Sequence, residues 1–495
     1  MFIYTVAILH IMLFTYAAVS KIMDFQNFEI QLGQSPLLTI FAGVLAYAVP
    51  TIEIVIAIFL IFPKTRIPAI YASCFLMILF TIYIVMILNF TSFIPCSCGG
   101  VLEKLNWNEH LLFNIFFVAI ALIAIKWHTS LKHTTIVFAS FGGIGITLMS
   151  ALFLLSEDIM QNENPFIRRF PQGTAAMTAK IDLRNPDFYI AGVSKEKIFL
   201  GNRKAQLQVV VIDKSLKNRK QYAIKLNKEN ANFRNITIRV QNEIFYVFDG
   251  TAFVIYKGTI KDWKASMISE KEFGFNDIQF ISNKSVMIRG RKPNRPDNIL
   301  AKVTQGNPLK FKINDNLLQK QIDGFFDTDG TMSYSFEFNK LIYTYYYRNE
   351  YIVIDSTLTL VHRGNTIDTT SKAKIKIAKI EKSGDIKLAA PPYSVNKVTT
   401  VTNNLLFVNS VLRGKYENKK VWKSATAVDV YDFTNHKYLL SFYVHDIEGA
   451  RMKDFYATSE ALYIISGTYL IKYEYGQRIK SKISKNLPAG NRKAD

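Results

Sequence analysis

The feature of the sequence that most constrains its fold is a set of five apolar stretches confined to the first third of the chain. Each is close to the roughly 20 residues that a helix needs to cross a bilayer. The stretches cover about residues 2–20, 38–63, 67–90, 110–126 and 135–155. The first lacks the basic start and small-residue cleavage site of a signal peptide, so we expect it to be retained. The sequence therefore predicts a bundle of five membrane-spanning helices.

The loops between these stretches orient the bundle. The turn 64–66 and the loop from Lys126 to His133 each hold two Lys or Arg residues, whereas the loops 21–37 and 91–109 hold one each. Because basic loops stay in the cytoplasm, this bias predicts a cytoplasmic N-terminus. Residues 156–495 then lie in the periplasm of a bacterial inner-membrane protein.

Charge is concentrated after the apolar third. The net charge is +21, of which residues 1–135 contribute +1 and the remainder +20. Such a basic region is attracted to anionic surfaces, here membrane lipid or an acidic envelope surface. The expected location outside the cytoplasm argues against nucleic acid as its partner.

Residues 186–480 contain recurrent strand-like runs rich in Ile, Val, Tyr and Phe, separated by turn residues. Examples are Phe188–Gly201, Ile236–Gly258, Ile278–Gly290, Met332–Asp355, Val398–Gly414 and Phe455–Tyr475. Their starts lie roughly 40–70 residues apart, close to the length of a propeller blade. We predict an all-β domain, a six-bladed β-propeller, with a pair of two-sheet sandwiches as the alternative.

The flanks of this domain carry weaker signals. Residues 157–185 are predicted to be a linker and residues 481–495 a basic tail. The Tyr343–Tyr347 cluster is interpreted as a strand with aromatic faces rather than a binding site. Because propellers usually present a binding face, fold-level analogy suggests a recognition module.

A pair of cysteines marks the loop 91–109. Cys96 and Cys98 are separated by one residue, and Pro95 with Gly99–Gly100 fits a tight turn. A disulfide across so short a spacing would be strained and labile, which suits thiol–disulfide exchange. The alternatives are a stapled turn or two inert thiols. A metal site needs more ligands than this loop offers, even with His110, so no metal is expected.

Trp107, His110 and Asn114 lie at the beginning of the fourth predicted membrane helix and share one helix face. His110 could stabilise a thiolate of the cysteine pair or move its proton. Alternatively, Trp107 and His110 form an interfacial anchor at the headgroup level.

Two ionisable residues fall inside the apolar stretches. His10 and Glu53 both lie near mid-membrane, where charges are costly, so we expect them to face the interior and to pair. A structural hydrogen bond is one interpretation; a proton path or quinone site is the other. Pro50 is expected to kink the second helix. Cys74 is predicted to be a packed small hydrophobe, which leaves no second cysteine pair.

Together these residues resemble the MauE branch of the MauE/DoxX membrane proteins. The similarity covers about residues 1–130 and is most specific at the cysteine motif. The matching residues are Ser20-Lys21, Asp24-Phe25, Ser35-Pro36, Pro50 with Glu53, Phe80–Tyr83, Pro95–Gly100, Trp107, His110, Phe113 and Asn114.

The resemblance implies a four-helix MauE/DoxX-like domain over residues 1–130, to which residues 131–156 add a fifth helix. It also implies a membrane partner in extracytoplasmic disulfide chemistry, because the founding member is required to make a disulfide-rich methylamine dehydrogenase subunit alongside a thioredoxin-like protein. This chain adds residues 156–495, as in long forms from Bacteroidetes-like bacteria, so methylamine metabolism is not expected. The quinone-linked oxidases DsbB and VKOR use two cysteine pairs, whereas this chain has one.

The leading hypothesis is thus a membrane thiol–disulfide redox protein in which Cys96, Cys98 and His110 act on a thioredoxin-like or other periplasmic protein. The two alternatives are a non-enzymatic receptor or assembly factor, and a quinone-linked thiol oxidase with quinone as cofactor.

Overall fold

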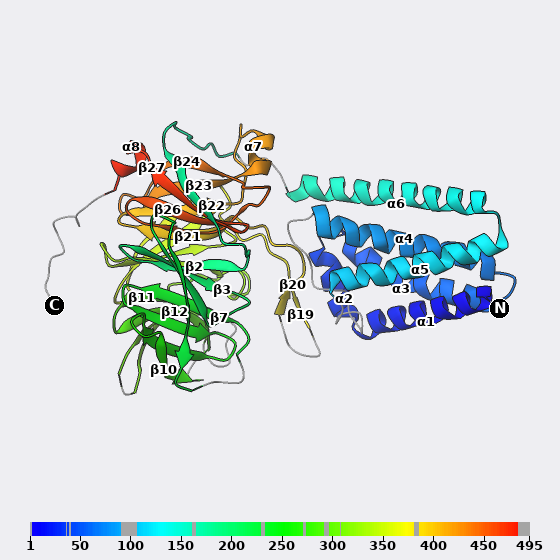
Figure 1. Cartoon of the computed structure of the whole chain (residues 1–495), viewed down its shortest axis with the longest axis horizontal. Coiled ribbons are helices and arrows are strands. Elements are labelled where there is room, and N and C mark those ends of the chain that lie inside the picture. Colours follow the sequence, from blue (N-terminus) through cyan, green and yellow to red (C-terminus); the bar gives the residue numbers. More distant parts are fainter. Residues whose placement is uncertain are drawn as a thin grey trace. The chain divides into compact units, whose positions relative to one another are not determined.

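The computed structural model describes residues 2–35, 37–38, 41–90, 106–160, 165–228, 233–270, 274–291, 297–306, 308–380 and 386–483. The chain forms two compact units (Figure 1). The first comprises Met1–Asn162 with Ile375–Tyr393, and the second comprises Glu163–Lys374 with Ser394–Asp495.

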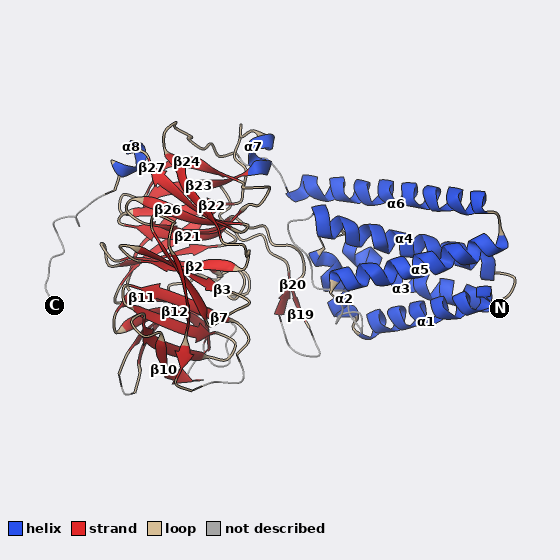
Figure 2. Cartoon of the chain, viewed as in Figure 1, coloured by secondary structure: helices blue, strands red, loops and turns tan. Residues whose placement is uncertain are grey.

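The first unit is a helical bundle, as Figure 2 shows. Its helices are α1 (Phe2–Met23), α2 (Phe25–Gln34), α3 (Ala42–Ile61), α4 (Arg66–Phe90), α5 (Trp107–His128) and α6 (Leu131–Met160). All except α2 are long and apolar enough to cross a membrane, which confirms the five predicted spans. The short helix α2 was not predicted. It lies in the expected loop 21–37, where the buried Phe28 and Leu32 give only one turn of apolar spacing.

Small and large apolar residues share the interior of the bundle. Ala18, Ala46 and Ala121 are almost completely buried and allow close approach of the helix backbones. Apolar side chains such as Met12 and Phe116 instead cover the exterior, as expected for a surface in contact with lipid.

The start of α5 is fixed by a capping box. The Asn106 side chain accepts a hydrogen bond from the Glu109 backbone N–H at 2.9 Å, and the Glu109 carboxylate accepts one from the Asn106 N–H at 2.8 Å. The helix therefore begins at Trp107, one turn before the start of the apolar stretch 110–126.

The second unit is a six-bladed propeller built from antiparallel sheets (Figure 2), which confirms the predicted fold and rules out the sandwich pair. Blade one holds β2 (Phe188–Val193), β3 (Lys197–Asn202), β4 (Gln208–Asp213) and β5 (Arg219–Ala223). Blade two holds β7 (Ile236–Gln241), β8 (Ile244–Asp249), β9 (Val254–Thr259) and β10 (Lys264–Glu270), with the short β6 (Lys225–Leu226) beside β10. Blade three holds β11 (Gly274–Ser282), β12 (Ser285–Arg291), β13 (Asn298–Thr304) and β14 (Lys310–Asn314).

The remaining blades complete the ring. Blade four holds β15 (Gly330–Ser335), β16 (Lys340–Tyr345), β17 (Glu350–Asp355) and β18 (Leu360–Asn365). Blade five holds β21 (Asn396–Thr402), β22 (Leu405–Ser410), β23 (Ala425–Asp432) and β24 (Lys437–His445), with α7 (Lys419–Ser424) before β23. Blade six holds β25 (Met452–Ala457), β26 (Ala461–Ser466), β27 (Tyr469–Tyr475) and β1 (Ala175–Asp182), and α8 (Gln477–Lys480) follows β27. The first strand of blade six contacts those of blades five and one, which closes the ring.

The ring is closed by strands from both ends of the propeller. β1 pairs antiparallel with β27, from Ala175 opposite Tyr475 to Asp182 opposite Tyr469. The expected linker 157–185 therefore overlaps the end of α6 and contains a strand of the last blade. The strand was missed because β1 is a mostly exposed edge, without the apolar alternation of a half-buried strand.

The segment before β1 is also anchored. The Arg168 side chain is fully buried and forms ion pairs with Asp429 of β23 and with Glu417. A separately folding propeller must therefore begin near residue 165, before the end of the expected linker. At the other end, the tail residues 484–495 lie outside the described residues.

The connection between β18 and β21 carries an extra hairpin, β19 (Ile377–Lys379) with β20 (Ile386–Leu388). The hairpin belongs to the first unit, where β20 packs against α2. On either side of it, the chain is held in blade four: Asn349 N donates to Thr370 O at 2.8 Å, and Val395 N donates to Tyr346 O at 2.8 Å.

Replacing residues 375–393 with a short Gly/Ser linker should leave the propeller stable. All six four-stranded blades lie outside the deleted segment, and shortening a closed loop changes its closure entropy by less than about 1 kcal/mol. Thermal unfolding of the purified variant, followed by far-ultraviolet circular dichroism at β-sheet wavelengths, should match that of the parent chain. A large fall in the β-sheet transition would show that the hairpin supports the propeller.

Candidate functional site

The predicted cysteine motif lies in the connection between α4 and α5. Cys96 and Cys98, with Pro95 and Gly99–Gly100, fall within residues 91–105, outside the described residues, as does Pro36 of the other matching motif. The structure does describe the helix that follows the cysteines and the cavity beside that helix.

The first turns of α5 carry the predicted polar face. Trp107, His110 and Asn114 all line one cavity, which confirms that they share a side of the helix. The rings of Trp107 and His110 are stacked, with centroids 6.2 Å apart and an interplanar angle of 30°. Asn114 is only 3% exposed. Its Nδ2 and the buried Nδ1 of His110 find no hydrogen-bond partner among the described residues.

The cavity has a volume of about 360 Å³ and is lined by all six helices of the first unit. Its walls are mostly apolar and include several aromatic rings. The aromatic side chains that line it are Phe14, Tyr16, Phe28, Phe80, Tyr83, Trp107 and Phe113. The position and composition of the cavity are those of a small-molecule site between the helices of a bundle.

An ion pair forms a second polar wall of the cavity. Lys21 Nζ, near the end of α1, lies 2.7 Å from Glu53 Oε1 and 3.0 Å from Glu53 Oε2 in α3. The Glu53 side chain is 1% exposed and that of Lys21 is 15% exposed, so the pair is largely removed from solvent. Burying either charge alone in an apolar bundle would be costly, and the attraction between the two charges offsets this cost.

The predicted pairing of His10 with Glu53 is wrong, although both residues are buried. His10 Nδ1 lies 2.9 Å from the Val6 carbonyl in its own helix, and its ring packs edge-on against Phe117, with centroids 5.2 Å apart. The sequence reading treated Lys21 as a loop residue, whereas α1 continues to Met23. The sequence does contain a signal for the observed pair. It has one lysine in the last turn of the apolar helix α1 and one glutamate inside the apolar helix α3.

Other predicted features have simpler roles. Cys74 is buried in the core of the bundle, as predicted for a small hydrophobe. Pro50 lies within α3. In the propeller, Tyr343 and Tyr345 are buried residues of β16, in agreement with a strand that has aromatic faces. Within the described ranges, no cluster of three or more His, Cys, Asp or Glu residues is arranged to hold a metal ion.

Residues 1–126 match the family model described as "Methylamine utilisation protein MauE". The helical region is thus similar to the MauE family over these residues. The match covers the first five helices and ends near the end of α5, so α6 and the propeller lie outside the matched region. His110, Asn114, Lys21 and Glu53 all lie within the matched region.

Solved structures resemble the chain at low identity. A DUF4221-family protein from Bacteroides vulgatus aligns with a TM-score of 0.38 and 12% identity, over 64% of this chain and 98% of its own. The calcium-binding protein regucalcin from Agrobacterium tumefaciens aligns with a TM-score of 0.36 and 11% identity, over 63% of this chain and 95% of its own. No curated protein sequence matches the chain.

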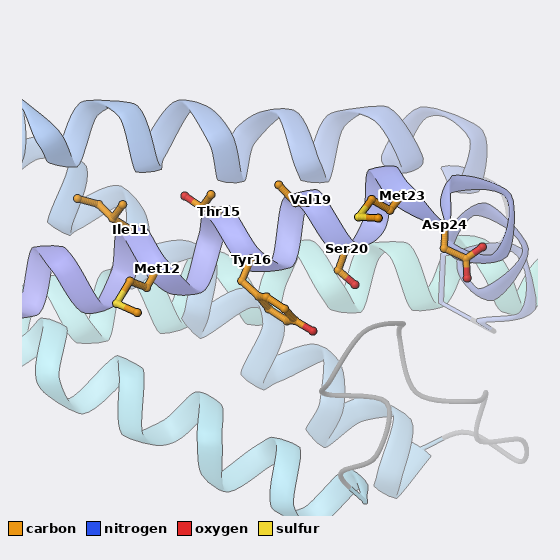
Figure 3. Close-up of a pocket in the computed structure, with 8 residues that line it drawn as sticks. All are labelled: Ile11, Met12, Thr15, Tyr16, Val19, Ser20, Met23 and Asp24. Carbon is orange, nitrogen blue, oxygen red and sulfur yellow. The ribbon is translucent and has the colours of Figure 1, made fainter.

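The cavity between the helices of the first unit adjoins a shallow groove on the outer face of α1. Figure 3 shows the residues of this groove along the helix. They are Ile11, Met12, Thr15, Tyr16, Val19, Ser20, Met23 and Asp24. Tyr16 lines both the groove and the cavity, so the two spaces meet at its side chain.

Proposed function

We propose that this protein is a membrane thiol–disulfide exchange protein that acts through Cys96 and Cys98. The observation that carries the proposal is the polar wall of the cavity between the helices of the first unit. His110 and Asn114 stand in the first two turns of α5, directly after the segment that holds the cysteine pair. An imidazole that follows the two thiols closely in the sequence can supply what exchange needs, a group that takes a proton from the attacking sulfur.

The exchange proceeds in two steps. The thiolate of one cysteine attacks a disulfide of the partner, breaking its S–S bond and forming a mixed disulfide. The second cysteine then attacks the mixed disulfide, which closes the Cys96–Cys98 bond and releases the reduced partner. The pair loses two electrons and the partner gains them; the reverse sequence oxidises a partner dithiol. His110 holds the proton between the steps.

The proposed site of action is the periplasmic face of a bacterial inner membrane. Two spans, α5 and α6, separate the cysteine segment from the propeller, so both lie on the same side of the membrane whichever way the bundle is inserted. The loop charges favour the periplasmic side. There the propeller would recruit a thioredoxin-like or other periplasmic partner, and its basic character favours one with an acidic surface.

Trapping tests this proposal directly. Cys96→Ser and Cys98→Ser should each abolish exchange, and one of them should accumulate a mixed disulfide because the resolving thiol is missing. Non-reducing gels of whole membranes, followed by identification of the trapped protein, give the readout. His110→Ala should slow exchange only in part, because it lowers the thiolate fraction but leaves both sulfurs.

Cys74→Ala is the matched control, since this cysteine is packed in the bundle core. The control should trap nothing and should retain exchange. A fully active Cys96→Ser/Cys98→Ser double variant would refute the exchange function and would favour a receptor or assembly role.

A further inference from the structure

We propose that the cavity between the helices of the first unit binds a lipid-soluble quinone, and that this quinone is the electron acceptor of the cysteine pair. The electron-transfer part rests on the proposed thiol function; the binding part rests on the cavity alone. Three observations carry it: the unsatisfied donors, the aromatic walls and the connection to the lipid-facing groove.

The polar groups of the cavity include hydrogen-bond donors that suit a ligand with carbonyl oxygens. The amide Nδ2 of Asn114 can only donate, and it lacks an acceptor within the part of the chain that the structure describes. Nδ1 of His110 is likewise without a partner there and donates in one of its tautomers. Lys21 adds an ammonium group to the same wall. A buried donor without an acceptor is costly, so a ligand that offers carbonyl oxygens gains from Asn114 and His110, whereas Lys21 already donates to Glu53.

The rest of the lining favours a flat apolar ring. Trp107 and Phe113 come from α5, and Phe80 and Tyr83 come from α4. Aromatic side chains such as these stack on planar ligands. A quinone combines a planar ring with two carbonyl oxygens, whereas a fatty acyl chain would leave the donors of Asn114 and His110 unsatisfied.

The route into the cavity favours a ligand from the bilayer. Tyr16 is 43% exposed and belongs both to the cavity and to the groove on α1 (Figure 3). Ile52 and Leu148 line the cavity and are also exposed on the apolar exterior. An isoprenoid tail could therefore extend into lipid along α1 while the ring occupies the cavity.

The reaction balances with the quinone as oxidant when the exchange runs in the direction that oxidises a partner dithiol, because that exchange leaves Cys96 and Cys98 reduced. The Cys96 and Cys98 thiols lose two electrons and two protons as the S–S bond forms. The quinone takes both electrons and both protons at its carbonyl oxygens and leaves as the quinol. His110, the first polar residue of the cavity after the cysteine segment, carries the protons between the thiols and the ring.

Binding is tested with the purified full chain in detergent and ubiquinone-1 as the probe. Quinones quench tryptophan fluorescence, and Trp107 lines the cavity, so quenching should saturate. Asn114→Leu should weaken binding at least tenfold. Asn89→Leu is the matched control, because its amide donates to the Val85 carbonyl on the exposed side of α4. Quenching that does not saturate, or equal affinity in both variants, would overturn the site.

Electron transfer is measured separately. After reduction with dithiothreitol and its removal, the chain should convert ubiquinone-1 to ubiquinol, followed by loss of the quinone absorbance, with one equivalent per cysteine pair. The Cys96→Ser/Cys98→Ser variant should bind the quinone with unchanged affinity but not reduce it. If partner trapping succeeds and the quinone is not reduced, the acceptor role is wrong and the exchange function stands. If the quinone binds and neither it nor a partner reacts with the thiols, the exchange function is wrong and only the binding site stands.

Discussion

Replacing Arg168 with alanine is expected to lower the free energy of unfolding of the propeller by about 3–5 kcal/mol, the usual cost of breaking a buried ion pair. Arg168 Nε lies 2.7 Å from Asp429 Oδ1, Nη1 lies 2.5 Å from Glu417 Oε1, and Nη2 lies 2.6 Å from Ser410 Oγ. Alanine would leave both carboxylates buried without their cation. Urea unfolding of the purified chain, followed at β-sheet wavelengths, measures the change.

The electrostatics of this network support the size of that effect. Burial alone would lower the pKa of Arg168, but the charges and hydrogen bonds of Asp429 and Glu417 outweigh it, and the pKa of the guanidinium is raised. Arg168 is therefore charged at every accessible pH, and the whole ion pair contributes to the stability of the native state. Lysine cannot reproduce the forked contacts, so Arg168→Lys should recover little of the loss.

The neighbouring Arg169 provides a matched control. Its guanidinium donates to the Tyr438 carbonyl at 2.8 Å, in an exposed position. Arg169→Ala should therefore cost only about 1 kcal/mol, the net value of an ordinary hydrogen bond. Equal costs for the two arginines would contradict the view that the segment before β1 is anchored by a buried charge.

The predictable parts of the fold are those whose buried residues form long apolar patterns in the sequence. The five spans are continuous apolar stretches, and the blades repeat apolar hairpins such as Ile236–Gln241 with Ile244–Asp249. β1 escaped prediction because an exposed edge strand is held by its hydrogen bonds to β27, which depend on sequence some 290 residues away. α2 escaped because it is only 10 residues long and half of these are Gln, Asn or Glu, a composition that is typical of a loop.

The candidate site also has a part that the sequence predicts and a part that it does not. The shared face of Trp107, His110 and Asn114 follows from spacing on a single helix, so sequence was sufficient. The partner of Glu53 depends on how α1 and α3 pack, which no local pattern specifies. Sequence alone therefore pairs His10 with Glu53 by their depth in the membrane and counts Lys21 in the loop 21–37. The roles of Cys96 and Cys98 stay predictions.

The Lys21–Glu53 pair should behave as a coupled unit in a double-mutant cycle. Lys21→Met and Glu53→Leu are each expected to destabilise the bundle by about 3 kcal/mol, because each leaves one charge buried without its partner. The double variant should recover most of this loss, since two apolar side chains of similar size replace the pair. Thermal unfolding of the detergent-solubilised chain, followed at helical wavelengths, gives the four free energies. A double variant that costs only about 1 kcal/mol corresponds to a coupling of about 5 kcal/mol.

His10→Leu supplies the control that separates the observed pairing from the predicted one. Because His10 hydrogen-bonds within its own helix, its replacement should add to Glu53→Leu without coupling. Strong coupling to His10 and none to Lys21 would contradict the described arrangement. A stable Lys21→Met/Glu53→Leu variant would also remove the charged wall of the cavity while keeping Asn114 and His110 in place. Any change in its quinone affinity would then measure what the charges contribute to binding, apart from what they contribute to the fold.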